Sequence, residues 1–372
     1  MEKPLPAALQ NIPAEGSSPV DKPHPSTNNT LRQQLSRLGV LALAAILAVV
    51  IFAPSLSKLS FNVWVGSLAA GLCLSFVALG VYISFRILDF PDLTLDGSFP
   101  LGASVAAAMI IGGSNPYLTL PAAFVGGALA GIITALIATR LKIHSLLASI
   151  LTTTALISIN LRVMGRSNIP LLNSPTIFSP FIGSFRSFLE GFQNDSLLKL
   201  SNNLLVILYI GLVVLLVKLL FDRFMRTEVG LAMRATGDNQ QMVRSLGRDT
   251  QGMIVLGLAL SNGLVGLSGA IFAQYQGFAD VNMGLGLIIA GLAAVIIGET
   301  LFRPHRIAGA TLAVILGMVV YRLAIAAALN ISLPLPGGGF LRIEAQDVKL
   351  ATALLVLLAL WFTHVQNKRK GR

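Results

Sequence analysis

About ten apolar stretches, most of them as long as a membrane helix, limit what this chain can fold into. A helix needs about 20 apolar residues to cross the hydrocarbon core of a bilayer. The chain is 54% hydrophobic and only 12% charged, whereas soluble domains carry about 25% charged residues. We therefore predict an all-α integral membrane protein whose expected spans are Leu38–Leu56, Phe61–Ile83, Gly97–Ile111, Leu118–Thr139, Leu146–Met164, Leu204–Leu220, Met253–Tyr275, Met283–Gly298, Ala308–Ala327 and Leu350–His364.

The expected architecture is a polytopic bundle of about 8–10 transmembrane helices, because the third and eighth stretches are short for a full crossing. Met1–Ser36 is rich in Pro, Ser, Asn and Gln and lacks an apolar core, which predicts a disordered cytoplasmic tail. Arg37–Gln366 forms the transmembrane domain, with an uncleaved first span expected rather than a signal peptide. Asn367–Arg372 is a basic cytoplasmic C-terminus.

The net charge of +11 could indicate nucleic-acid binding, but the basic residues lie between apolar stretches, where the positive-inside rule puts them. Placing both termini and the segment Asp222–Gln251 in the cytoplasm puts 19 of the 27 Lys and Arg inside. The segment Gly165–Asn203 is then external. We expect contact with membrane lipid and no nucleic-acid partner, and the lone cysteine, Cys73, gives no disulfide.

Two short motifs indicate an internal repeat. Phe90–Leu93 leads from one span into the Gly-rich stretch Gly97–Ile111, and Phe278–Val281 leads from another into Met283–Gly298. In the expected topology the two units run in opposite directions, an arrangement common among transporters. The alternative is a chance likeness of two loops.

Several polar residues fall within or beside the spans, where an acid costs several kcal/mol unless it is paired or hydrated. Acids and small residues at these places are candidates for a translocation pathway. The alternative is that the acids cap helix N-termini, with Asp96 as N-cap of the stretch from Gly97, and that the glycines serve close packing. Arg322 is expected to extend toward the membrane surface. The candidates for the pathway are Asp92, Asp96, Gly97, Asn160, Asp280 and Gly284.

Known catalytic and nucleotide-binding motifs do not occur in the sequence. There is no GxxxxGK[ST] phosphate loop, no HExxH and no CxxC pair, and the four histidines are scattered. We expect no enzyme activity, no metal site and no cofactor on this chain.

The segment Asp222–Gln251 has the pattern of two short helices. The first is expected to end at Gly237, where glycine would supply a left-handed conformation. The second is expected to begin with Asp238 or Asn239 as its cap and to end at Gly247. Such a helix–Gly–helix unit suits insertion into a partner, while the alternative is a solvated basic loop.

The string GLAMRATGDN at Gly230–Asn239, followed by SLG, resembles the coupling loop of permease subunits of ATP-binding-cassette importers of the branched-chain amino acid and ribose type. A closer subgroup, that of amino-acid transport permeases, carries three long strings that stand here at Tyr82–Ala103, Leu146–Arg166 and Ala259–Gly284. The resemblance runs from about Phe61 to the end of the last span, and the tail and first span lie outside it.

The resemblance implies a permease of the bacterial inner (plasma) membrane that works with a second permease copy, a cytoplasmic ATPase dimer and an extracytoplasmic substrate-binding protein. ATP and Mg²⁺ would bind the ATPase. By the same resemblance the coupling loop docks on the ATPase through Thr227, Gly230, Arg234, Ala235, Gly237, Asp238, Asn239 and Gly247. The substrate implied is a small polar solute, namely an amino acid, and the subgroup suggests an aromatic one. The competing interpretations are a secondary transporter that uses Asp92, Asp96 or Asp280 as its ion site, and a channel or membrane scaffold.

Overall fold

The computed structural model describes residues 61–180, 195–329, 332–334 and 340–342, together with three single positions near the C-terminus. Within these ranges six helices are long and apolar enough to cross a membrane, and two apolar helices are shorter. The expected spans Leu38–Leu56 and Leu350–His364, and both termini, lie outside the described ranges apart from those single positions. The all-α membrane architecture is confirmed.

The first half of the bundle begins with a long helix that changes character before it breaks. Helix α2 spans Phe61–Val81 and continues as the π-helix η2, Tyr82–Ile87. After a break come the short helix α3, Leu95–Ile111, and then α4, Pro116–Arg140. Helix α5, Ser145–Met164, completes this half.

The second half repeats this order. Helix α7 spans Asp195–Met225, and the short helices α8, Glu228–Asp238, and α9, Gln240–Ser245, follow it. A long helix α10, Thr250–Gln276, is then followed by a break, the short helix α11, Leu287–Phe302, and α12, Ile307–Leu329. The same order of elements therefore occurs twice, as α2–α3–α4 and as α10–α11–α12. In each case a long helix is followed by a break, a short helix and another long helix.

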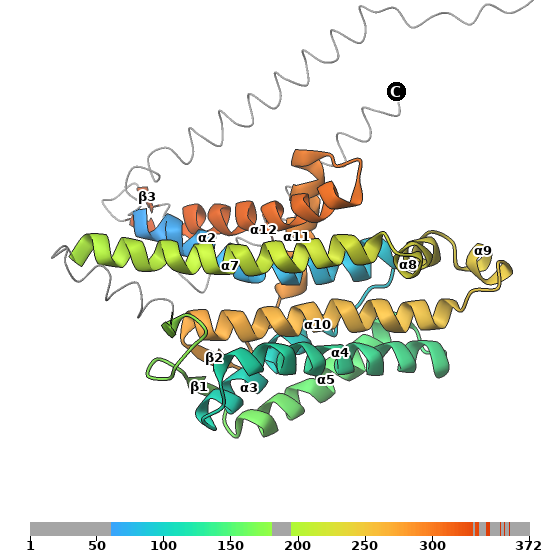
Figure 1. Cartoon of the computed structure of the whole chain (residues 1–372), viewed down its shortest axis with the longest axis horizontal. Helices are drawn as coiled ribbons and strands as arrows, with labels where there is room; N and C mark the ends of the chain where they lie inside the picture. The colour runs from blue at the N-terminus through green and yellow to red at the C-terminus, as the bar shows by residue number, and fades with distance from the viewer. Residues whose placement is uncertain are drawn as a thin grey trace, which may run out of the picture. The chain divides into compact units, whose positions relative to one another are not determined.

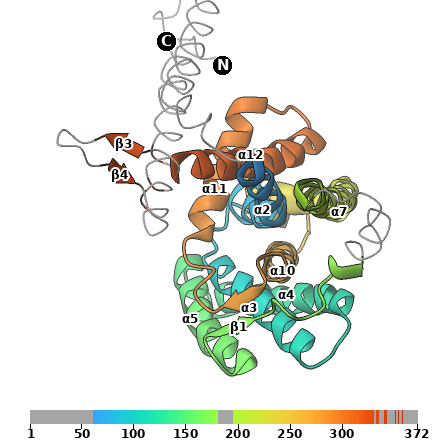
Figure 2. The same cartoon turned by 90° about the vertical axis from the view of Figure 1, so that its left-hand side faces the viewer.

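The two repeats are inverted and exchange their helices. The end of η2 and the beginning of α10 both pack against α8, so α2 and α10 run in opposite directions. Helices α3 and α4 pack on α10, whereas α11 and α12 pack on α2. Figure 2 shows the two resulting groups, α3, α4, α5 and α10 in one and α2, α7, α11 and α12 in the other. The predicted inverted repeat is therefore present.

Burial distinguishes central helices from peripheral ones. The spans of α2 and α10 are mostly buried inside the bundle, whereas α4, α5 and α7 expose most of their apolar residues. Helix α4 presents Val125, Leu129 and Ile133, each about half exposed, at helical spacing on one face. Large exposed apolar surfaces of this kind mark contact with a membrane or another protein.

Four short strands form two antiparallel pairs in the described part of the chain. Strand β1, Asn168–Pro170, pairs antiparallel with β2, Phe278–Asp280, with Asn168 opposite Asp280. Strands β3, Ser332–Pro334, and β4, Phe340–Arg342, form a second pair. In Figure 1 the β1–β2 pair lies at one end of the bundle and α8 and α9 at the other. We call the α8–α9 end the basic end, because Arg86, Arg140, Arg226 and Arg248 lie there.

Candidate functional site

The inner face of α8 packs against three other helices, and two of its contacts are made by glycines. A Cβ built on Gly230 would stand 2.4 Å from the carbonyl oxygen of Phe224, at the end of α7. A Cβ on Gly237 would stand 1.9 Å from the carbonyl oxygen of Ile87, in η2. Met233, fully buried, lies against Gly257 of α10. Helix α8 therefore contacts both helix groups at once.

Side chains cap the two short helices. The Thr227 hydroxyl oxygen accepts a hydrogen bond from the Gly230 amide at 3.3 Å. Asn239 Oδ1 accepts one from the Met242 amide at 3.0 Å, which confirms the predicted cap of the second helix. Gly247 follows that helix with φ +78°, a left-handed conformation that favours glycine. Each cap satisfies backbone donors that the first turn of a helix leaves unpaired.

The predicted role of Gly237 as a left-handed helix end is wrong. Helix α8 continues through it to Asp238, and Gly237 has no positive φ. Glycine is needed at this position because the Ile87 carbonyl lies so close that no Cβ would fit. The sequence pattern identified the residue but not the reason, since close approach of another helix cannot be read from one segment.

The outer face of the α8–α9 unit combines apolar and charged residues. Leu231 is 52% exposed and Leu246, at the tip, is 73% exposed. Met242 is also exposed, and Arg234 and Ala235 are partly buried. Glu228 pairs with Arg248 at 3.7 Å across the unit. An exposed apolar surface with a charged rim is typical of a protein-docking site.

A buried polar network lies where α2 breaks before α3. Asp92, fully buried, accepts a hydrogen bond from the Thr94 amide at 2.9 Å and one from Asn262 Nδ2 at 2.7 Å. Asn262 Oδ1 accepts a bond from the Ser98 hydroxyl at 2.7 Å. The Thr94 hydroxyl meets that of Thr134, 2.7 Å away on α4. The network satisfies the buried polar atoms and joins α3, α4 and α10.

Asp96 does not cap its own helix, so the capping alternative is wrong for this residue. Helix α3 begins at Leu95, with Thr94 as its N-cap. The Asp96 carboxylate instead accepts hydrogen bonds from the amides of Gly286, at 3.2 Å, and Ile288, at 3.0 Å. These amides begin α11, where the partial positive charge of the helix favours an anion. Asp96 thus connects the first short helix to the second.

Gly284, Gly97 and Asn160 lie beside this connection. A Cβ on Gly284 would stand 2.0 Å from the carbonyl oxygen of Asp96, and one on Gly97 would meet Leu156 of α5 at 2.9 Å. Asn160 Nδ2 donates to the Gly97 carbonyl at 3.3 Å. Asn160 Oδ1 is buried without a hydrogen-bond partner in the described part of the chain. The structure therefore brings Asp96, Gly97, Asn160 and Gly284 together.

Asp280 lies apart from this group. Its Oδ2 accepts a hydrogen bond from Asn168 Nδ2 at 3.2 Å, and its Oδ1 accepts one from the Asn282 amide at 2.8 Å. It belongs to the short β1–β2 pair at the end of the bundle away from α8. Its position in the repeat matches that of Asp92, but its surroundings differ, because β1 has no counterpart next to Asp92.

Arg322 turns into the bundle rather than extending along it to the membrane surface. Its guanidinium carbon lies 5.8 Å from the centroid of the Phe272 ring on α10. Its Cβ also faces Gly71 of α2. The aromatic face offers partial negative charge to the guanidinium, and this contact corrects the sequence-based expectation.

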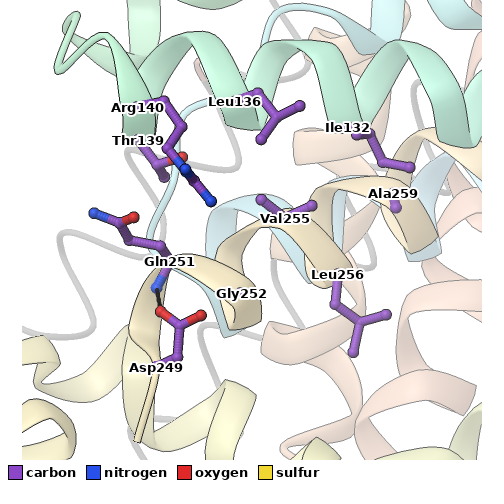
Figure 3. Close-up of a pocket in the computed structure, with 10 residues that line it drawn as sticks. All are labelled: Ile132, Leu136, Thr139, Arg140, Asp249, Gln251, Gly252, Val255, Leu256 and Ala259. Atoms are coloured by element: carbon purple, nitrogen blue, oxygen red, sulfur yellow. Dashed lines mark hydrogen bonds between the residues drawn. The ribbon is translucent and has the colours of Figure 1, made fainter.

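Among the cavities lined by described residues, two open at the basic end. One of about 360 Å³ lies between α4 and α10 and is lined by apolar side chains, with Arg140, Asp249 and Gln251 among the polar ones. Figure 3 shows the Arg140 side chain directed into it and the hydrogen bond from the Gln251 amide to Asp249. The other, of about 460 Å³, lies beside α7 and α12 and contains Lys218, Arg223 and Arg226.

Sequence reasoning missed the partners of these residues. Asn262 holds Asp92, and Asp222 accepts bonds from Lys218 and, at 2.7 Å, from the Thr311 hydroxyl. The available signals were a lone Asn inside an apolar span and a Lys–Asp pair four residues apart near a helix end.

No group of three or more metal-ligating residues occurs among the residues that the structure describes.

Comparison with known proteins gives the family. The family model for the permease component of branched-chain amino acid transport systems matches residues 63–361. A tyrosine transport system permease protein of Clostridioides difficile is 38% identical over 286 residues, 77% of this chain and 86% of its own length. A probable branched-chain amino acid transport permease, LivH, of Methanocaldococcus jannaschii is 28% identical over 63% of this chain and 72% of its own length.

An uncharacterized protein of Rickettsia prowazekii is 35% identical over 65% of this chain and 78% of its own length. The family match and the six apolar helices together make this a multi-pass protein of the bacterial inner membrane. Its relatives are transport subunits rather than enzymes. The chain belongs to the family of permease components of branched-chain amino acid transport systems.

Proposed function

We propose that this chain is the membrane-spanning subunit of an ATP-binding-cassette importer, and that the α8–α9 unit transmits the movement of a separate ATPase to the helix bundle. The observation that carries the proposal is the two-sided construction of α8. Its inner face packs on η2, α7 and α10 without space for larger residues. Its outer side exposes Leu231, and the adjoining α9 tip exposes Leu246.

This construction suits the transmission of force. Closure of an ATPase around ATP can shift a permease only if its contacts differ between the two states. Because α8 touches both helix groups, a displacement of α8 changes how one group sits against the other. ATP and Mg²⁺ bind the ATPase in this proposal, and the functional unit contains two permease copies and a substrate-binding protein.

The proposed substrate is a small polar solute, most simply an amino acid, with an aromatic amino acid as the first candidate to assay. The names of the Clostridioides and Methanocaldococcus relatives support this choice. In this proposal the substrate-binding protein provides most of the selectivity, and the permease provides the pathway beside Asp96, Gly97, Asn160 and Gly284.

The test is a mild-detergent purification of the tagged chain from its host, with the co-purifying proteins identified. We expect a stoichiometric subunit that carries a GxxxxGK[ST] loop. Leu231→Asp and Leu246→Asp should each release it, because a charge would replace an exposed apolar contact. Gln241→Ala, a change at an exposed polar position of the same unit, is the matched control and should retain it. Retention of the ATPase by both Leu variants would refute the docking assignment.

The ion-coupled alternative is weakened by the structure. Both Asp92 oxygens accept protein hydrogen bonds, and so do both Asp96 oxygens. These bonds join α3 to α10 and to α11, so both acids have a structural role in this conformation. Uptake that collapses on addition of an ionophore while ATP is held constant would nevertheless favour that alternative over the importer.

A further inference from the structure

The cavity between α7 and α12 has an unusual set of charges for a membrane protein. Its walls contain Lys218, Asp222, Arg223 and Arg226, three cations and one acid, together with Leu219, Thr227 and Ala308. The cavity volume is about 460 Å³. It lies where α7 ends, so it is at the level at which lipid headgroups meet the basic end of the bundle.

The single acid of this cavity, Asp222, already accepts hydrogen bonds on both of its carboxylate oxygens. Asp222 Oδ2 accepts a hydrogen bond from Lys218, four residues earlier, and Asp222 Oδ1 accepts one from Thr311 of α12. Lys218 and Asp222 are both buried. Arg223 and Arg226 make no ion pair or side-chain hydrogen bond within the described residues. Two guanidinium groups therefore remain to neutralise an anion at this cavity.

The surface that continues from the cavity is apolar. On α7, Leu212, Leu215 and Leu219 are each at least half exposed, and their spacing puts them on neighbouring turns above the cavity. Leu312 of α12 is also exposed. Two guanidinium groups next to a row of exposed leucines match the two parts of a phospholipid, its phosphate headgroup and its acyl chains. Basic pockets between membrane helices on the cytoplasmic side are known to bind such headgroups.

We propose that this cavity binds the phosphate-bearing headgroup of an anionic phospholipid, with Arg223 and Arg226 as its ligands. Arginine suits this role because its planar guanidinium donates two parallel hydrogen bonds to phosphate oxygens. The buried Lys218–Asp222–Thr311 connection holds α7 and α12 in place as the rigid wall. Bound lipid would also contact Thr227, the residue that caps α8.

The cavity between α4 and α10 provides the matched control. Arg140 lines it together with Asp249, so its side chains sum to no net charge. A zwitterionic or neutral environment of this kind gives no preference for an anionic headgroup. Arg140→Gln removes one arginine from the same end of the bundle without touching the proposed site.

The experiment uses the purified full-length chain in detergent and native mass spectrometry with added phosphatidylglycerol or phosphatidylcholine. We expect the wild-type chain to retain phosphatidylglycerol preferentially. The double variant Arg223→Gln/Arg226→Gln should bind it about 30-fold more weakly, since each cation near the surface contributes about five- to sixfold to the affinity. Arg140→Gln should behave like the wild type, and Arg223→Lys/Arg226→Lys should retain much of the preference.

Several results would overturn the proposal. Equal retention of phosphatidylglycerol by the wild-type chain and the double Gln variant is one, and an equal loss in Arg140→Gln is another. Displacement of the lipid by millimolar inorganic phosphate would assign the cavity to free phosphate instead. The monodispersity and melting temperature of each variant show that it is folded. Because no ATPase or substrate is present, the result is independent of the proposed importer function.

Discussion

The carbonyl oxygen of Ile87 lies 1.9 Å from the position that a Cβ of Gly237 would take. This contact joins the last residue of the π-helix η2 to the last turn of α8. A π-helical turn inside a longer helix often marks a functional site. Here it presents a carbonyl to the helix that we propose to couple with the ATPase.

Replacement of Gly237 by alanine should separate these two helices. The added methyl group cannot fit, so we expect a destabilisation of about 1–3 kcal/mol, typical of an overpacked site, together with a loss of transport. The measurement is the melting temperature of the purified chain and uptake into cells. Gly211→Ala on α7, where nothing lies within 4 Å of the new Cβ, is the control. Equal stability of the two variants would contradict this packing.

Asp96→Asn should weaken the connection between α3 and α11. Asparagine preserves the shape, but it removes the negative charge from the N-terminus of α11 and replaces one acceptor oxygen by a donor. We expect a loss of about 1–2 kcal/mol, measured by unfolding in mixed detergent. Asp89→Asn is the matched control, since Asp89 is exposed and Asn accepts its positive φ equally well. The assignment fails if both substitutions have the same effect.

Asp92 and Asn262 should be energetically coupled. Alanine at either position leaves the other partner buried without its hydrogen bond, so the second substitution should cost less than the first. A double-mutant cycle should give a coupling energy of about 1–3 kcal/mol. As a control, Asp92→Ala is combined with Thr119→Ala, which removes the separate contact between Thr119 and Gln274. That combination should be additive.

Two adjacent glycines of α4 should respond differently to alanine. A Cβ on Gly127 would stand 2.2 Å from the carbonyl oxygen of Asn262, whereas the nearest atom to one on Gly126 is 3.9 Å away. We expect Gly127→Ala to cost about 1–3 kcal/mol and Gly126→Ala to be neutral or to stabilise by up to about 1 kcal/mol. Thermal unfolding of both purified variants checks this. A destabilised Gly126→Ala would show that α4 packs on α10 through a different face.

Part of this structure could be predicted because it depends on local sequence. The membrane helices follow from the length of the apolar stretches, and the inverted repeat follows from two FPD- or FAD-type breaks. Asn239 and Gly247 were identified as cap and stop because capping involves residues within one turn. Helix ends were less accurate: α7 begins nine residues before the apolar stretch from Leu204.

The exchange of helices between the repeats could not be predicted in this way. Asp96 has the sequence position of a cap for α3, yet its carboxylate binds the start of α11, about 190 residues later. Gly237 has the sequence position of a left-handed helix end, yet it lies within the last turn of α8. Glycine is needed there because the Ile87 carbonyl of η2 comes so close. Both corrections involve contacts between segments that are distant in the chain.

The sequence by itself determined that this chain is a helical membrane protein, which end of the bundle is basic, and where its helices break. Hydrophobic length, charge asymmetry and capping are properties of short segments, so they can be read without knowing the fold. The tertiary structure alone decided which helix each acid and glycine serves. Those roles depend on close approach between helices, and a local sequence pattern carries no information about which distant segment comes near.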